Sequence, residues 1–163
     1  TEKRRMMLEV SLIRDGQTIV TDCAINDAVI HGFGDCIRMT AWCDGDMVTS
    51  FSGDGIILAT PTGSSAYSLS AGGPILSPNI DAIIITPICA HTLHTRPIVI
   101  SANETVEIET TGPANLMSDG YGQIPVLDNV IVKKSTLNAK FIRFKRKNFY
   151  TLLKDKLIDW NQN

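Results

Sequence analysis

The sequence predicts a mainly β fold, a two-layer β-sandwich-like domain with one short helix and a C-terminal amphipathic helix. Three observations predict it: β-rich runs in which apolar and polar residues alternate, Asp-Gly turns between such runs, and the regular spacing of short strands along the chain. At 163 residues, the chain suits one domain with its own hydrophobic core. No internal repeat, linker or low-complexity tract divides it.

Two hairpins are expected first. MLEVSLIR and QTIVT flank Asp15-Gly16, and IRMTAWC and MVTSFS flank Asp44-Gly45-Asp46. Asp-Gly between β-rich runs is a strong hairpin signal, because both residues tolerate the left-handed backbone of a tight turn. Further short strands are expected at residues 56–60, 82–86, 98–100, 105–110, 124–127, 129–133 and 140–144.

Two segments break the β pattern. Residues 65–71 are rich in Ser and Ala and precede Gly72-Gly73-Pro74, so a short helix should follow the TPTGSSAY turn and end at the glycines. At residues 148–160, apolar residues recur at helical spacing with charged residues between them, which predicts the terminal amphipathic helix. Its apolar stripe consists of Phe149, Leu152, Leu153, Leu157 and Trp160.

Charge and composition exclude several classes of partner and site. The formal net charge of −2 gives no field that attracts nucleic acid or an anionic membrane. No apolar run approaches the roughly 20 residues that span a bilayer, so we expect a cytoplasmic protein. His91 and His94 lack a third ligand, and the four cysteines lack paired spacing, so we expect no metal site and reduced thiols. The cysteines are Cys23, Cys36, Cys43 and Cys89.

The stretch most suggestive of chemistry is SGDGIILATPTGSSAYSLSAGGPILSP, residues 52–78. A strand delivers the chain to Pro61-Thr62-Gly63-Ser64-Ser65, where a helix start would present free backbone N–H groups to an anion. The structural alternative is a helix whose serines satisfy only its own first turn. Tyr67 adds an aromatic face suited to a planar base. Four hydroxyls, those of Thr60, Thr62, Ser64 and Ser65, exceed what one cap can use.

This stretch resembles the signature of the NAD kinase family, which commonly reads DG, a strand and then TPTGSTAYxxSAGGPI. Asp54-Gly55 begins the match, AIND at residues 24–27 resembles the family's LNE, and IIITPICAHTLHTRP at residues 83–97 resembles its ITPICPHTLSxRP. Ser118-Asp119-Gly120 matches a further turn. The resemblance covers essentially the whole chain.

Three residues depart from the family's pattern. Ser65 replaces the usual Thr but keeps a hydroxyl, and Ala90 replaces the usual Pro. Asp27 replaces the usual Glu, which withdraws the carboxylate by about one methylene, so a direct contact could become water-mediated.

The resemblance implies that residues 1–163 correspond to the C-terminal β-rich NAD-binding domain of an NAD kinase. Such an enzyme phosphorylates the 2′-hydroxyl of NAD's adenosine ribose with ATP or polyphosphate, giving NADP. The family's GGDG motif and catalytic Asp lie in an N-terminal α/β domain outside this sequence, and FSGDG at residues 51–55 is not that motif. We therefore expect no catalytic residue here, no activity of the chain alone, and dependence on the missing domain for ATP or polyphosphate and Mg²⁺.

The same resemblance implies the binding residues and the assembly. Asn26-Asp27 alone would be read as a turn, but in the family these positions line the adenosine side of the NAD pocket. The position of Asp54 contacts the nicotinamide-ribose end, often across a subunit boundary, so a homo-oligomer (dimer or tetramer) is expected. The terminal helix at 148–160 packs on the N-terminal domain in relatives. The implied NAD-binding residues are Asn26, Asp27, Asp54, Thr62, Ser65, Ala66, Tyr67, Ser68, Ser70, Cys89 and Tyr121.

Two alternatives stay open at this point. A stand-alone NAD-sensing or oligomerisation module would bind NAD without any complementing chain. A relative of the diacylglycerol or sphingosine lipid kinases would share the broader architecture, but the chain lacks a basic or apolar membrane-facing stretch. The sequence does not identify the phosphoryl donor or a preference between NAD and NADH.

Overall fold

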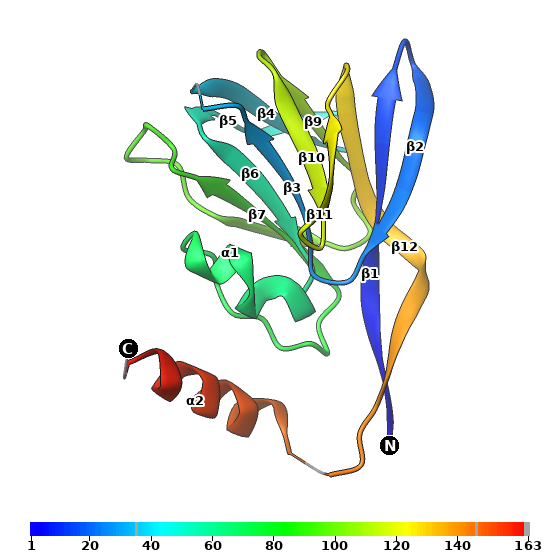
Figure 1. Ribbon diagram of the computed structural model, residues 1–163, viewed down its shortest axis with the longest axis vertical. Coiled ribbons are helices and arrows are strands. Elements are labelled where there is room, and N and C mark those ends of the chain that lie inside the picture. Colours follow the sequence, from blue (N-terminus) through cyan, green and yellow to red (C-terminus); the bar gives the residue numbers. More distant parts are fainter. Residues whose placement is uncertain (35, 146, 162–163) are drawn as a thin grey trace.

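A computed structural model describes residues 1–34, 36–145 and 147–161. Within these residues the chain forms two six-stranded sheets packed face to face, with a short helical segment at one end and a separate terminal helix below it (Figure 1). The predicted mainly β, sandwich-like class is confirmed. The strands of the first sheet run in the order β2-β1-β12-β9-β4-β5 and those of the second in the order β11-β10-β3-β6-β7-β8.

The first sheet contains β1 (Glu2–Arg14), β2 (Gln17–Ala24), β4 (Ile37–Cys43), β5 (Asp46–Gly53), β9 (Val106–Thr110) and β12 (Asn129–Ile142). The second contains β3 (Asp27–Gly32), β6 (Gly55–Ala59), β7 (Ala82–Ile88), β8 (Ile98–Ser101), β10 (Ala114–Ser118) and β11 (Tyr121–Pro125). The helices are the 3₁₀ turn η1 (Thr62–Ser65), α1 (Tyr67–Ser70) and α2 (Phe149–Trp160).

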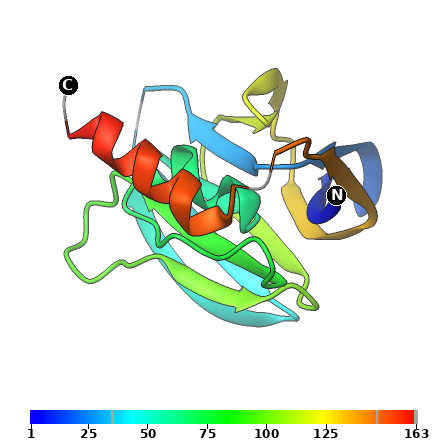
Figure 2. The ribbon, with the colours of Figure 1, turned by 90° about the horizontal axis from the view of Figure 1, so that it is seen from below.

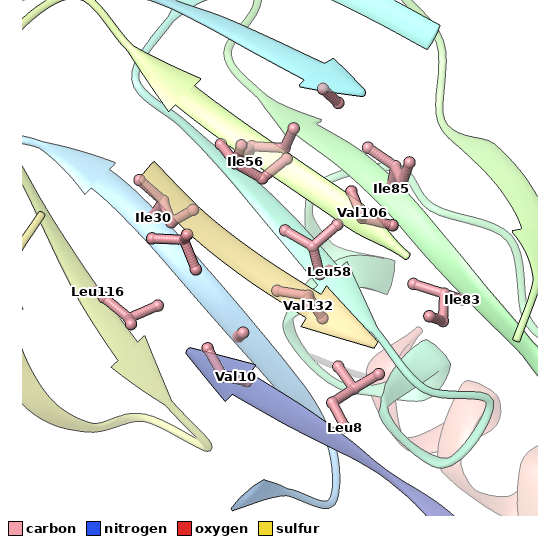
Figure 3. Close-up of a cluster of buried hydrophobic side chains, with 14 of the residues drawn as sticks. Leu8, Val10, Ile30, Ile56, Leu58, Ile83, Ile85, Val106, Leu116 and Val132 are labelled. Atoms are coloured by element: carbon pink, nitrogen blue, oxygen red, sulfur yellow. The ribbon is translucent and has the colours of Figure 1, made fainter. Parts of the chain in front are cut away.

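The main core lies between the two sheets and is built by alternate residues of each strand (Figure 3). β7 is buried along its whole length because both of its faces are covered. Ile83 and Ile85 enter the main core, whereas Ile84 joins a second cluster on the outer face, against which Ala71 and Leu76 pack. The segment after the serine-rich turn thus covers the second sheet, which explains the apolar run in β7.

Both predicted hairpins are confirmed. Asp15 and Gly16 have φ of 51° and 72°, and Asp44 and Gly45 have φ of 48° and 89°, so each pair forms a two-residue turn of the kind that matches strand twist. Asp46 belongs to β5, where it pairs with Cys43.

The predicted strands differ from the structure in three respects. The expected strands at 129–133 and 140–144 are one strand, β12, because the residues between them continue to pair with the long β1. β3 and β10 were not predicted. The sequence before β3 reads as a turn, and β10 carries Asn and Ser, which have low strand propensity.

The helix predicted at 65–71 is shorter and interrupted. A 3₁₀ turn ends at Ser65, Ala66 leaves helical geometry with φ −105° and ψ −129°, and α1 has four residues. Gly72, at φ +96°, ends it. A helix this short does not present the N-terminal anion site that the sequence suggested.

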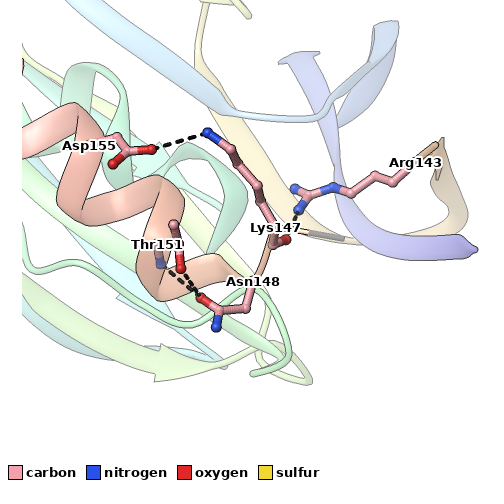
Figure 4. A network of polar contacts seen from close by, with 5 residues as sticks. All are labelled: Arg143, Lys147, Asn148, Thr151 and Asp155. Atoms are coloured by element: carbon pink, nitrogen blue, oxygen red, sulfur yellow. Dashed lines mark hydrogen bonds and ion pairs between the residues drawn. The ribbon is translucent and has the colours of Figure 1, made fainter. Parts of the chain in front are cut away.

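The terminal helix α2 is confirmed and lies beyond the sandwich, below the η1–α1 segment in Figure 1 and in front of it in the view from below in Figure 2. Asn148 caps it by accepting a hydrogen bond from the N–H of Thr151 at 2.8 Å (Figure 4). Lys156 Nζ donates to the backbone oxygen of Ser65 at 2.6 Å, which ties α2 to the serine-rich turn. None of the helices in the described ranges combines the length and apolarity needed to cross a membrane.

Candidate functional site

The chain passes from the first sheet to the second at Asp54, between β5 and β6. A Cβ at Gly53 would lie 2.9 Å from the backbone oxygen of Ile88, and one at Gly55 would lie 2.7 Å from that of Ile30. The two glycines therefore allow a close approach to neighbouring strands that other residues would prevent. The N–H of Asp54 donates to the Ile88 oxygen at 3.0 Å, which fixes the backbone at Asp54.

Residues 61–67, which we call the serine turn, pack directly against the residues that precede β3. A Cβ at Gly63 would collide with the backbone of Asn26, 2.5 Å from its carbonyl carbon. Thr60 joins the two segments, because its N–H donates to the Asn26 oxygen at 2.9 Å and its hydroxyl donates to the Ile25 oxygen at 2.6 Å. These contacts place the serine turn beside the start of β3.

Two serines of this region also serve the fold. Ser64 Oγ donates to the backbone oxygen of Pro61 at 2.7 Å and accepts from the N–H of Leu76 at 2.9 Å. Ser68 is fully buried, with its Oγ 2.8 Å from that of Thr86. The sequence offered four hydroxyls at this turn, more than one helix cap can use. Those of Thr60 and Ser64 are already hydrogen-bonded within the protein.

Asp119, in the two-residue turn between β10 and β11, anchors the residues before β3 from the other side. Its carboxylate accepts hydrogen bonds from the backbone N–H groups of Ile25 (2.8 Å), Asn26 (2.7 Å) and Asp27 (3.1 Å). Asp119 and Gly120 have φ of 52° and 77°, as a two-residue hairpin turn requires. The Asp-Gly turn is thus also the clamp that holds Asn26 and Asp27.

A cleft of about 240 Å³ opens between the serine turn, the start of β3 and the β10–β11 turn. We call it the acidic cleft. It unites four of the predicted site residues, Asn26, Asp27, Ala66 and Tyr67, from two distant segments. Its full lining is Asn26, Asp27, Val29, Ala66, Tyr67, Met117, Asp119 and Gly120.

Asp27 is the carboxylic acid of the cleft whose pKa departs from its ordinary value. Only 5% of its surface is exposed, and within the described part of the chain no group donates a hydrogen bond to its carboxyl. Burial, and secondarily the neighbouring carboxylate of Asp119, raises the pKa of Asp27 to about 6. Near neutral pH this carboxyl can therefore accept a hydrogen bond or, when protonated, donate one.

Tyr67 forms the aromatic wall of the acidic cleft, with 41% of its surface exposed. Burial raises the pKa of its phenol, and the acidic groups of Cys89, Asp27 and Asp54 raise it further. Asp54 and Cys89 therefore lie within electrostatic reach of the Tyr67 hydroxyl, although neither lines the cleft. Cys89 has φ +48°, a backbone conformation uncommon for cysteine.

The remaining predicted residues lie elsewhere. Thr62 and Ser65 line a second cavity of about 180 Å³, together with Arg5 and Arg143 and with none of the residues that line the acidic cleft. We call this space the arginine cavity. Ser70 is exposed on α1, and Tyr121 is 82% exposed on β11.

Sequence reasoning missed three contributors to these sites. The Ser118-Asp119-Gly120 turn matched the family's pattern, but the role of Asp119 as an acceptor for three backbone N–H groups follows only from the pairing of β10 with β3. Nothing in the sequence pointed to Arg5 and Arg143, which come together through the pairing of β1 with β12.

Metal ligands are not gathered at either site. Among the described residues, no group of three or more His, Cys, Asp or Glu side chains could hold a metal ion. His91 and His94 are both exposed, and the Nδ1 of His91 lies 3.5 Å from the thiol of Cys36.

Comparison with known proteins gives consistent matches. Residues 25–144 match the family described as ATP-NAD kinase C-terminal domain. The NAD kinase of Desulforamulus reducens is 39% identical over 165 residues, which cover 97% of this chain and 57% of that protein. The NAD kinase of Thermoanaerobacter sp. is 41% identical over 166 residues, which cover 98% of this chain and 59% of that protein.

Solved structures agree with the sequence comparisons. A yeast NADH kinase in complex with NADH superposes with a TM-score of 0.87 at 30% identity, covering 99% of this chain and 50% of that one. An NAD kinase from Archaeoglobus fulgidus in complex with ATP superposes with a TM-score of 0.83 at 26% identity, covering 96% of this chain and 60% of that one. The chain thus spans about half to three fifths of the length of these relatives.

Proposed function

Because the chain belongs to the ATP-NAD kinase C-terminal domain family, we propose that it is the NAD-binding part of an NAD kinase. The activity proposed for the whole protein is transfer of a phosphoryl group from ATP or polyphosphate to the 2′-hydroxyl of NAD's adenosine ribose, giving NADP. The acidic cleft is proposed as the place where the dinucleotide binds.

The observation that carries this proposal is the meeting of Asn26, Asp27, Ala66 and Tyr67 at one cleft. The family resemblance implied these residues for NAD binding, and they come from segments about forty residues apart in the sequence. A small concave site with an aromatic wall and a few converging polar groups is the usual form of a nucleotide pocket.

Each group of the cleft has a chemistry suited to a dinucleotide. The Tyr67 ring offers a face on which a planar base can stack. The carboxyl of Asp27 and the amide of Asn26 can hydrogen-bond ribose hydroxyls, which both donate and accept. Asp54 and Cys89, near the Tyr67 hydroxyl, are proposed to lie toward the nicotinamide end, as the family resemblance implies.

The phosphoryl donor and the divalent cation require more than this chain. The family resemblance implies that Mg²⁺ accompanies the phosphates of the donor and depends on the N-terminal domain of the family. A base for the 2′-hydroxyl is likewise expected from the N-terminal domain of the family, so the chain alone should not catalyse NADP formation.

The test compares the chain alone with a chimera that carries the N-terminal part of the Desulforamulus reducens enzyme ahead of residue 1. Both should bind NAD in calorimetry, and only the chimera should form NADP from NAD, ATP or polyphosphate, and Mg²⁺, at about 1–100 per second as is typical of kinases. Turnover at that rate by the chain alone would contradict the assignment of roles. A chimera that binds NAD and ATP but forms no NADP would favour a sensing module instead.

A further inference from the structure

Three Asp-Gly pairs in this chain form two-residue hairpin turns, and a comparison of the three separates the role of the aspartate from that of the turn. Asp15, Asp44 and Asp119 have φ of 51°, 48° and 52°, and each is followed by a glycine with positive φ. Asn adopts this left-handed backbone as readily as Asp does. The carboxylate is therefore not required to form any of the three turns.

The three carboxylates have different partners. That of Asp15 is exposed and lies 3.9 Å from the guanidinium of Arg14. That of Asp44 accepts one backbone hydrogen bond, from the N–H of Thr105 at 2.9 Å. That of Asp119 accepts from three consecutive N–H groups at 2.7 to 3.1 Å. The same kind of turn thus carries a carboxylate clamp at the acidic cleft.

Residues 25–27 have every backbone polar group engaged. The carboxylate of Asp119 accepts from their three N–H groups, and the N–H of Asp119 donates to the oxygen of Asp27 at 2.9 Å. The other two backbone oxygens of the segment accept from the hydroxyl and the N–H of Thr60. Two residues, Asp119 and Thr60, therefore fix the backbone conformation of this segment from opposite sides.

This backbone engagement leaves the side chains of Asn26 and Asp27 to meet a ligand, and both line the acidic cleft. An ionised carboxylate only accepts hydrogen bonds, so it matches three N–H donors, and hydrogen bonds to a charged group are stronger than those between neutral groups. Since both oxygens of Asp119 accept N–H groups of this segment, Asp119 acts on a ligand through the segment that it holds.

We propose that Asp119 is a positioning residue for the dinucleotide, which holds residues 25–27 so that Asn26 and Asp27 present their side chains to the acidic cleft before the ligand arrives. This inference rests on the proposed function, because NAD is the ligand whose binding the clamp favours. Rigidifying a site in its bound arrangement raises affinity, because less order has to be created on binding. The sandwich supplies that rigidity, since β10 pairs with β3 and the β10–β11 turn lies beside the connection from β2 to β3 (Figure 1).

The first test is calorimetric NAD titration of Asp119→Asn, which keeps the turn but replaces one carboxylate oxygen by an NH₂ group that cannot accept. NAD affinity should fall about tenfold, since at least one of the three N–H groups loses its acceptor. Asp15→Asn is the matched control for the turn, and Asp44→Asn is the control for losing a carboxylate bond to the backbone elsewhere. Both controls should bind NAD as the unchanged chain does.

A double-mutant cycle separates positioning from a general loss of stability. If Asp119 acts through Asn26, the weakening of NAD binding by Asp119→Asn should be at least about threefold smaller in a chain that already carries Asn26→Ala. A general loss of stability would weaken binding by the same factor in both chains. Equal factors in the two chains would therefore overturn the inference.

Amide hydrogen exchange of the unchanged chain tests the clamp without a ligand or a variant. The N–H groups of residues 25–27 should exchange more slowly than exposed loop amides, and at least one should lose this protection in Asp119→Asn. Fast exchange of all three in the unchanged chain would overturn the inference. Absence of NAD binding by the unchanged chain would contradict the proposed function, and with it the role of the clamp in binding. NAD binding that Asp119→Asn leaves unchanged would overturn this inference alone.

Discussion

The serine turn borders two spaces, which we call its two faces, and they carry opposite charge. On one face, the acidic cleft gathers Asp27 and Asp119 beside an aromatic ring. On the other, the arginine cavity gathers Arg5 and Arg143 beside the hydroxyls of Thr62 and Ser65. One seven-residue turn therefore contributes residues to an acidic space and to a basic one. The position of a residue in the TPTGSSAY motif therefore says little about the groups it can bind. Which of the two spaces the residue lines says more.

Gly63→Ala should have the largest effect, because it removes the contact on which both faces depend. A methyl group there collides with the Asn26 backbone, so we expect a loss of about 3 kcal/mol or more in the free energy of unfolding, measured by urea titration. NAD binding should weaken as well.

Gly16→Ala serves as the comparison for that variant. Gly16 has φ +72° but open space around it, so its substitution should cost about 1 kcal/mol and leave NAD binding unaffected. Equal losses for the two variants would show that backbone conformation, rather than contact between the turns, governs the site.

Tyr67→Ala should affect the acidic cleft only, because Tyr67 does not line the arginine cavity. Loss of the stacking surface is expected to weaken NAD binding by roughly 1–3 kcal/mol. Tyr121→Ala is a useful companion, because Tyr121 was also predicted at the site but is 82% exposed on β11. If both variants bind NAD as the unchanged chain does, neither tyrosine belongs to the pocket.

Asp27 makes the acidic cleft sensitive to pH. With its pKa raised from 3.8 to about 6, the folded chain holds the Asp27 proton more tightly than the unfolded chain. The free energy of unfolding should therefore fall as pH rises from about 4 through 6, by an amount of the order of 1 kcal/mol once solvent screening is allowed for.

Asp27→Asn should remove this loss. Relative to the unchanged chain, the variant should gain stability between pH 4 and pH 7 in urea titrations. Asp46→Asn, at an exposed hairpin end, is the matched control. A relative gain no larger than that of Asp46→Asn would show that the carboxyl of Asp27 is not perturbed by burial.

Ending the chain after Phe144 should have the smallest effect on the acidic cleft. It removes α2, which lines the arginine cavity but not the acidic cleft, so NAD affinity measured by calorimetry should change by less than about 0.5 kcal/mol.

The shortened chain also tests the predicted homo-oligomer by light scattering. The apolar stripe of α2 leaves Leu152 and Leu157 about one third exposed and could drive association. An oligomer that persists without α2 would place the contact on the sandwich, and a monomer with α2 present would contradict self-association.

Local signals predicted much of this fold and less of its sites. Asp-Gly pairs located the hairpins, and strand alternation located the core, because both depend on neighbouring residues. The family resemblance implied that Asn26 and Tyr67 belong to one pocket, and both line the acidic cleft. The arginine cavity could not be foreseen, because Arg5 and Arg143 lie at opposite ends of the chain and meet only through the strand register, in which Arg5 stands opposite Ala139. The sequence predicts two strands where the structure has the single strand β12, because the middle of β12 is strand only through its pairing with β1.

That register also contains an irregularity that bears on how such proteins diverge. Met6 stands opposite Asn138 and Leu8 opposite Lys134, so β12 contains two more residues than β1 over this interval. Such an insertion bends and twists a ribbon locally. Lengthening or shortening this interval would move α2 relative to the sandwich while leaving the acidic cleft intact. A relative could thereby place its terminal helix differently through a change in strand length alone, without altering any residue that lines the acidic cleft.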